Sequence, residues 1–113
     1  MVKVNWTEES KYWLNCIFVY ISSDNPTASI NTVNGIYEKA QVLQNLPEIG
    51  YKYQHSSKKH IRIILHGHYR IAYLYRKKEN AIDVLGVFHG KMEIKNYLRL
   101  SNPRNEYECI NAL

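Results

Sequence analysis

The residues of this chain that could do chemistry gather in one stretch, from Tyr51 to Lys78, which contains no Asp or Glu. The stretch holds eight of the fifteen lysines and arginines and four of the five histidines. Guanidinium and ammonium groups clustered in this way bind phosphate, and imidazoles can move protons near neutral pH. The pattern therefore indicates a surface that meets a polyanion. A solvated basic face without a partner and a surface for an acidic protein are the alternatives.

Two histidines of the stretch could also present imidazoles to a metal. His66 and His68 flank Gly67, and His55 or His60 could supply a third ligand to zinc. No Cys, Asp or Glu in the stretch completes a known zinc spacing, and Gly67 favours a hairpin turn. The chain also lacks the glycine-rich phosphate loops of nucleotide hydrolases and the nucleophile elbow of serine esterases. We therefore expect no metal and no other cofactor.

The composition is that of one globular domain. Of the 113 residues, 45% are hydrophobic and 22% are charged, and the net charge is +5. No apolar run approaches the roughly 20 residues of a membrane helix, and the amino end lacks the pattern of a signal peptide. We expect a cytoplasmic protein without membrane contact, whose Cys16 and Cys109 are free thiols. The expected domain spans residues 1–100, and residues 101–113 form a C-terminal tail.

The first half of the chain predicts one strand and two helices. A short strand over Val2–Asn5 precedes Thr7, which is a suitable N-cap for a helix that runs to about Ile21. The Asn25–Pro26 pair can cap and begin a second helix, which we expect to end near Leu46. The short connection between the two helices predicts an antiparallel helical hairpin.

The second half changes to a period of two. Ile61–Leu65, Tyr69–Arg76 and Ala81–His89 predict a three-stranded antiparallel meander, and Lys91–Leu100 predicts a short C-terminal helix. The whole order is that of an α+β sandwich with an N-terminal strand, a helical hairpin, the meander and the last helix. We expect the helices to cover one face of the sheet and the other face to carry Arg70 and at least part of the basic residues.

Four short motifs, spread over nearly the whole chain, carry a family resemblance. In chain order they are Val4-Asn5-Trp6-Thr7-Glu8-Glu9 followed by Tyr20 to Pro26, then L-x-x-x-P-x-x-G over Leu43 to Gly50, then His68-Tyr69-Arg70-Ile71-Ala72-Tyr73, and finally I-x-V-L-x-V-x-H-G over Ile82 to Gly90. Together they resemble the RelE/ParE superfamily of bacterial type II toxin–antitoxin toxins. The resemblance implies a toxin that arrests growth, serves in modules linked to plasmid stabilisation, and is neutralised by a cognate antitoxin that wraps it, as a toxin–antitoxin hetero-oligomer.

The superfamily contains two mechanisms. RelE-like members cut messenger RNA in the ribosomal A site, and ParE-like members poison DNA gyrase without known nuclease activity. We expect a ribosome-dependent mRNA endonuclease (an mRNA interferase) that needs no metal. The alternatives are a ParE-like non-catalytic gyrase inhibitor and a degenerate member that only binds its antitoxin.

The resemblance also implies two catalytic residues. Arg70 matches the arginine of the family's Y-R motif, which contacts phosphate in RelE-like nucleases, and a guanidinium suits that charge. His89 ends the last strand, where it could act as the general acid or base. The alternatives are an exposed strand arginine and a histidine that holds the turn after the strand.

A set of basic residues lies where RelE-like members orient RNA, and we expect it to bind nucleic acid through phosphate contacts. The set is Lys52, Lys58, Lys59, His60 and Arg62. The chain departs from the best-known RelE pattern at Met92, where an arginine is expected, and Tyr97 matches the family's later tyrosine only approximately. These departures leave open a histidine-based nuclease or no nuclease at all.

Overall fold

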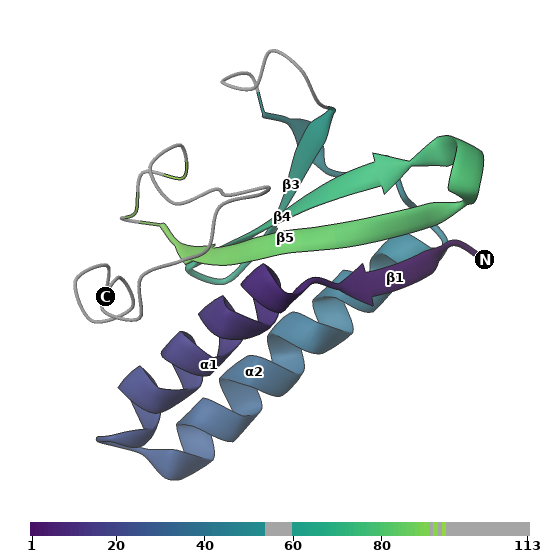
Figure 1. Cartoon of the computed structure of the whole chain (residues 1–113). Helices are drawn as coiled ribbons and strands as arrows, with labels where there is room; N and C mark the ends of the chain where they lie inside the picture. Colours follow the sequence, from purple (N-terminus) through teal and green to yellow (C-terminus); the bar gives the residue numbers. More distant parts are fainter. Residues whose placement is uncertain (54–59, 91, 93, 95–113) are drawn as a thin grey trace.

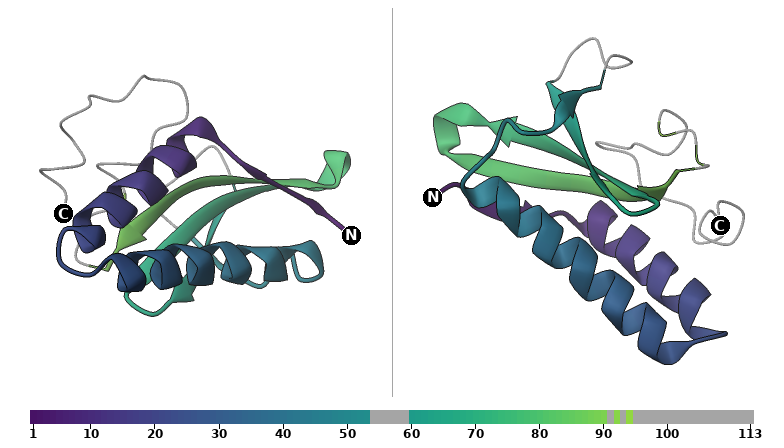
Figure 2. Two further views of the ribbon diagram at one scale, coloured as in Figure 1. Left: turned by 90° about the horizontal axis from the view of Figure 1, so that it is seen from below. Right: turned by 180° about the vertical axis from the view of Figure 1, so that it is seen from behind.

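A computed structural model describes residues 1–53, 60–90, 92 and 94, and its two helices pack beneath one face of a sheet (Figure 1). In chain order the elements are β1 (Lys3–Trp6), α1 (Glu8–Ser22), α2 (Pro26–Gln41), a 3-10 turn (Val42–Gln44), β2 (Tyr51–Lys52), β3 (Ile61–His66), β4 (Tyr69–Arg76), a second 3-10 turn (Lys77–Glu79) and β5 (Ala81–His89). The views from below and behind show the hairpin of α1 and α2 running along the sheet (Figure 2). The predicted α+β fold is confirmed.

The predicted helix starts are confirmed by their caps. The side chain of Thr7 accepts a hydrogen bond from the Ser10 N–H at 3.1 Å, and Asn25 accepts one from Ala28 at 3.1 Å. The second helix ends earlier than predicted, at Gln41, and a 3-10 turn follows. Pro47 has no N–H to continue the helical hydrogen bonds, so the chain tightens before it.

The sheet is larger than the predicted meander. Its order is β1-β5-β4-β3-β2, and all pairs are antiparallel except β1 with β5, which is parallel. The meander of β3, β4 and β5 is confirmed. Two features differ from the prediction: β1 joins the sheet beside β5, and Tyr51–Lys52 adds the short strand β2. A two-residue strand has no visible period, and a pairing 78 residues apart leaves no local signal.

Buried side chains form one cluster on each face of the sheet. On the helix side, Ile71 and Tyr73 of β4 pack with Ile36 of α2. On the other side, Ala72 of β4 belongs to a second cluster, in which Trp13 of α1 and Phe88 of β5 contact at 5.4 Å between ring centroids. The alternation along β4 therefore tells which face each later side chain occupies.

Some expectations change or fall outside the described residues. Cys16 is buried and disulfide-bonded, which corrects the predicted free thiol; that prediction came from the expected compartment rather than from geometry. Cys109, the predicted helix over Lys91–Leu100 apart from Met92 and Ile94, and the tail 101–113 lie outside the described residues. Within the described part of the chain, no helix has the length and apolar character needed to cross a membrane.

Candidate functional site

Arg70 and His89 leave the sheet on opposite faces. Arg70 lies opposite Phe88, on the face away from the helices, whereas His89 lies opposite Tyr69, on the helix side. The imidazole of His89 meets the Tyr69 ring edge-on, with 5.7 Å between ring centroids. Because neighbouring positions of a strand point to opposite faces, the two predicted catalytic side chains do not share one surface of the sheet.

One terminal nitrogen of the Arg70 guanidinium bonds to the backbone. Its Nη2 donates to the carbonyl oxygens of His89 at 3.3 Å and Gly90 at 3.4 Å, and also to that of Met92. Its Nε is buried and has no hydrogen-bond partner among the described residues. Arg70 therefore fixes the course of the chain after β5, and the alternative of an exposed strand arginine does not describe it.

His89 lies beside a second histidine at the end of the sheet. The rings of His68 and His89 are nearly parallel, with centroids 6.2 Å apart. Both residues border an open depression of about 410 Å³ that continues round the sheet end to Arg70. The depression thus touches both faces, although the charged end of Arg70 points at the backbone.

Three of the predicted nucleic-acid-binding residues meet at the other end of β4. Lys52, His60 and Arg62 line a pocket of about 230 Å³ whose other walls are Glu48, Tyr75 and Lys77. Arg62 braces the preceding loop, because its Nη1 donates to the carbonyls of Glu48 at 3.0 Å and Gly50 at 2.7 Å. Its Nη2 also lies 3.7 Å from the Glu48 carboxylate. The predicted Lys58 and Lys59 lie outside the described residues.

The two sets of predicted residues are therefore separated along the sheet. Arg70 is near the start of β4 and Lys77 follows its end, a separation of roughly 24 Å at about 3.4 Å per strand residue. The structure brings Lys52, His60 and Arg62 together and leaves Arg70 and His89 at the far end. Lys52 pairs with Arg62, which faces the helix side with Tyr73, so Arg62 does not lie on the face expected for the basic residues. By the alternation of β4, Arg70 and Arg76 do lie on that face.

All three arginines of the acid-free stretch bond within the chain. The third, Arg76, donates to both carboxylate oxygens of Asp83, at 2.9 and 3.1 Å. Hydrogen bonding to Asp83 raises the pKa of the Arg76 guanidinium above its usual range. Asp83 also accepts from the Asn5 side chain at 3.4 Å and so links β1, β5 and β4. The described lysines of the stretch are exposed instead; they are Lys52, Lys77 and Lys78.

Sequence reasoning missed Tyr73 as a polar anchor. Its buried hydroxyl donates to the Pro47 carbonyl at 2.9 Å and accepts from the Gly50 N–H at 3.0 Å. Burial raises the pKa of the Tyr73 hydroxyl above its ordinary 10.0. A Cβ at Gly50 would lie 2.8 Å from the Tyr73 hydroxyl and from the Ile63 carbonyl, so only glycine fits this close approach. The period of two predicts only that Tyr73 is buried, not which loop it holds.

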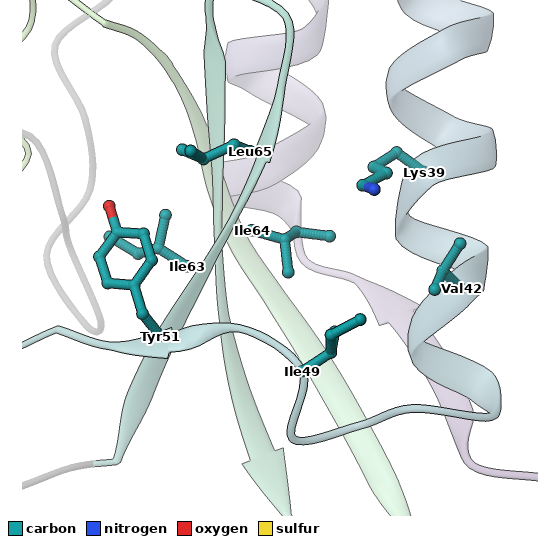
Figure 3. Close-up of a pocket in the computed structure, with 7 residues that line it drawn as sticks. All are labelled: Lys39, Val42, Ile49, Tyr51, Ile63, Ile64 and Leu65. Atoms are coloured by element: carbon teal, nitrogen blue, oxygen red, sulfur yellow. The ribbon is translucent and has the colours of Figure 1, made fainter.

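A groove along β3 was also missed. It has a volume of about 280 Å³ and is lined by Lys39, Val42, Ile49, Tyr51, Ile63, Ile64 and Leu65 (Figure 3). Its lining comes from α2, the turn after it, the next loop and two strands, so no run of sequence announces it. The two pockets that the predicted residues line are rich in charged and histidine side chains. This groove is instead mostly apolar, and Lys39 is the one charged residue in its lining.

Among the described residues no group of three or more His, Cys, Asp or Glu is placed to hold a metal ion. His66 and His68 face different neighbours. The His66 ring lies against α2, where a Cβ on Gly35 would come within 2.8 Å of its Nε2, whereas His68 stacks on His89. The two imidazoles of the His-Gly-His turn therefore do not converge.

Comparisons with known proteins address the family directly. Residues 4–94 match the family model described as the ParE toxin of the type II toxin–antitoxin system parDE. A solved structure titled "Chromosomal ParDE TA system from P. aeruginosa" superposes with a TM-score of 0.64 at 18% identity, over 79% of this chain and 96% of that chain. No curated protein matches. The resemblance to RelE/ParE toxins is thereby confirmed, and the chain belongs to the ParE toxin family of type II toxin–antitoxin systems.

Proposed function

We propose that this toxin arrests growth by binding DNA gyrase and not by cutting messenger RNA. The observation that carries the proposal is the arrangement of Arg70, whose guanidinium donates to backbone carbonyls while His89 projects from the opposite face. The ParE family match supports the same target. The proposal places the toxin in the cytoplasm with its cognate antitoxin.

The chemistry of RNA cleavage explains why this arrangement counts against a nuclease. Without a metal, the 2′-hydroxyl must lose a proton, the leaving oxygen must gain one, and a cation must stabilise the phosphate between them. The cation and the acid–base group must therefore reach one phosphate from the same side. Here Arg70 holds the segment after β5 through its Nη2, and His89 projects from the other face of the sheet.

A supercoiling assay tests the proposal. Purified toxin is added to gyrase, ATP and relaxed plasmid, and we expect supercoiling to be inhibited and to be restored when the antitoxin is added in equal amount. Unaffected supercoiling at a large excess of folded toxin would reject gyrase as the target. Unimpaired growth when the toxin is induced without antitoxin would instead indicate a member that only binds its antitoxin.

A ribosome-dependent mRNA endonuclease is the second candidate. It is favoured by the depression that His68, His89 and Arg70 border together and by the basic pocket at Lys52 and His60. In this scheme Arg70 stabilises the phosphate, His89 is the acid or base, and the basic pocket, with Lys58 and Lys59, holds the RNA backbone. In vitro translation with mapping of mRNA ends tests it, and intact mRNA beside active ribosomes and toxin rejects it.

A further inference from the structure

The outer edge of β1 is unpaired. β1 lies at one end of the sheet order and pairs with β5 alone, so the described residues place no strand on its other side (Figure 1). The stretch from Val4 to Trp6 carries no charge and no proline, which are two devices that proteins use to keep strand edges from pairing. An open edge of this kind is a template for pairing with another chain.

The backbone groups of Val4 and Trp6 point out of the sheet. On the inner side, the N–H groups of Lys3 and Thr7 donate to carbonyls of residues 80–84, at 3.1 and 3.3 Å. In a parallel ladder, alternate residues of a strand bond to the same neighbour, so the N–H and C=O groups of Val4 and Trp6 face away from β5. No other segment within the described residues takes up these groups, and they are free to bond to a second chain.

The side chains beside this edge are apolar and incompletely covered. Val4 and Trp6 pack at the border of the helix-side cluster, and the Trp6 ring stacks on Tyr37 of α2 with 5.9 Å between ring centroids. Tyr37 is 49% exposed. The indole Nε1 of Trp6 is buried and has no hydrogen-bond acceptor among the described residues. A buried N–H without an acceptor is unfavourable, so an acceptor brought by a second chain would stabilise this edge.

The sequence along the edge matches itself when it runs antiparallel. With Asn5 opposite Asn5 of a second copy, Val4 stands opposite Trp6 of that copy, and their outward N–H and C=O groups face one another as in a hydrogen-bonded pair. The same register brings Lys3 of one copy close to Glu8 of the other, at both ends of the pairing. Lys3 forms no ion pair among the described residues, and the Glu8 side chain is 94% exposed.

We propose that two copies of this chain pair antiparallel along β1, so that one sheet runs through both. A twofold arrangement uses the same residues on each copy, as closed homodimers do. Charge complementarity favours a second copy, since Lys3 and Glu8 lie at opposite ends of the edge. The contact of Glu8 with Lys11 at 3.3 Å is exposed and therefore weak, so it does not prevent this pairing. Because the contact is small, the dimer has a dissociation constant on the order of 10 µM.

Sedimentation velocity and amide hydrogen exchange of the purified toxin test the pairing together. We expect the fraction of dimer to rise with concentration through the dissociation constant. Exchange at the amides of Val4 and Trp6 should slow over the same range, whereas exchange at Tyr51 in β2, at the other edge of the sheet, should stay the same. A chain that stays monomeric at every concentration would overturn the proposal. A dimer with unchanged exchange at Val4 and Trp6 would assign the contact to another surface and reject β1.

Charge exchange tests the register. Lys3→Glu should weaken dimerisation at least about fivefold, because two acids then meet at each end, and Glu8→Lys should do the same with two cations. The double variant restores opposite charges, and we expect its affinity within about twofold of wild type. Lys52→Glu is the control for net charge, since Lys52 is exposed on β2 at the far edge, and we expect no weakening. A Lys3→Glu variant that dimerises like Lys52→Glu, or a double variant no tighter than the single ones, would overturn the proposal.

Discussion

The hairpin end of the sheet and the open edge of β3 are neighbours, since Leu65 borders the depressions at both, but they differ in what their own chain satisfies. At the hairpin end, Arg70 donates hydrogen bonds to the carbonyls at the end of β5 and in the segment after it. At the edge, apolar side chains are exposed, and no strand of the described residues pairs with β3 at Leu65. The comparison indicates that the charged end holds the fold, whereas the edge of β3 keeps large apolar side chains exposed.

Replacing Arg70 should have the largest effect on stability. Arg70→Ala removes charge-assisted bonds to three carbonyls, and we expect the free energy of unfolding to fall by about 2–3 kcal/mol. The free energy of unfolding of Arg70→Lys should lie between those of wild type and Arg70→Ala, because an ammonium group cannot reproduce the fork of donors of a guanidinium. Urea denaturation measures both. A variant as stable as wild type that had lost toxicity would show that Arg70 acts on the target and not on the fold.

Removing the hydroxyl of Tyr73 should lower both the stability of the fold and the affinity for the antitoxin. Tyr73→Phe leaves the Gly50 N–H and the Pro47 carbonyl without their partner, which should cost about 1–2 kcal/mol. That loop carries Ile49 and leads to Tyr51, so antitoxin affinity should fall as well, as titration calorimetry would show. Reduced stability with unchanged affinity would disconnect the anchor from the groove.

High pH should weaken the same anchor by a smaller amount. Burial raises the pKa of Tyr73 in the folded state above its unfolded value of 10.0. The contribution to stability is therefore complete below that value and is lost as pH rises from about 10 through the folded pKa. Tyr73→Phe should lose less stability than wild type over this range in urea melts. Burial also raises the pKa of Tyr69, but Tyr69 is present in both proteins, so its effect cancels in the comparison. If wild type and Tyr73→Phe lost equal stability at high pH, the Tyr73 hydroxyl would not be the group responsible.

Replacing His89 should have the smallest effect on function. His89→Ala alters contacts with Tyr69 and His68 but no group that the proposed gyrase binding requires. We expect growth arrest within about twofold of wild type at equal folded protein, since a change outside a binding interface leaves affinity nearly unchanged. Abolished toxicity in a folded His89→Ala protein would restore the acid–base role.

The sequence predicted what depends on local pattern and missed what depends on pairing. Thr7, Asn25 and the alternation of β4 each have a local signal, so the helix starts and the meander follow from them. The clustering of basic residues in the sequence could not show that Arg62 and Arg70 bond to the backbone. An arginine looks the same in a sequence whether its guanidinium meets a phosphate or a carbonyl.

The apolar groove along β3 has no local pattern in the sequence that could predict it. Its walls come from distant segments, and the exposure of Leu65 depends on β2 ending after two residues. The family motifs could indicate the superfamily because they preserve order and spacing, whereas the choice between two targets depends on which side chains the fold leaves available.

The central claim, inhibition of gyrase by binding, is tested most directly by titrating toxin against supercoiling at several gyrase concentrations. Binding predicts that the toxin concentration giving half inhibition rises in proportion to gyrase once gyrase exceeds the dissociation constant. Supercoiling that remains complete at every ratio, while the same toxin cuts mRNA on translating ribosomes at sub-stoichiometric amounts, would contradict it.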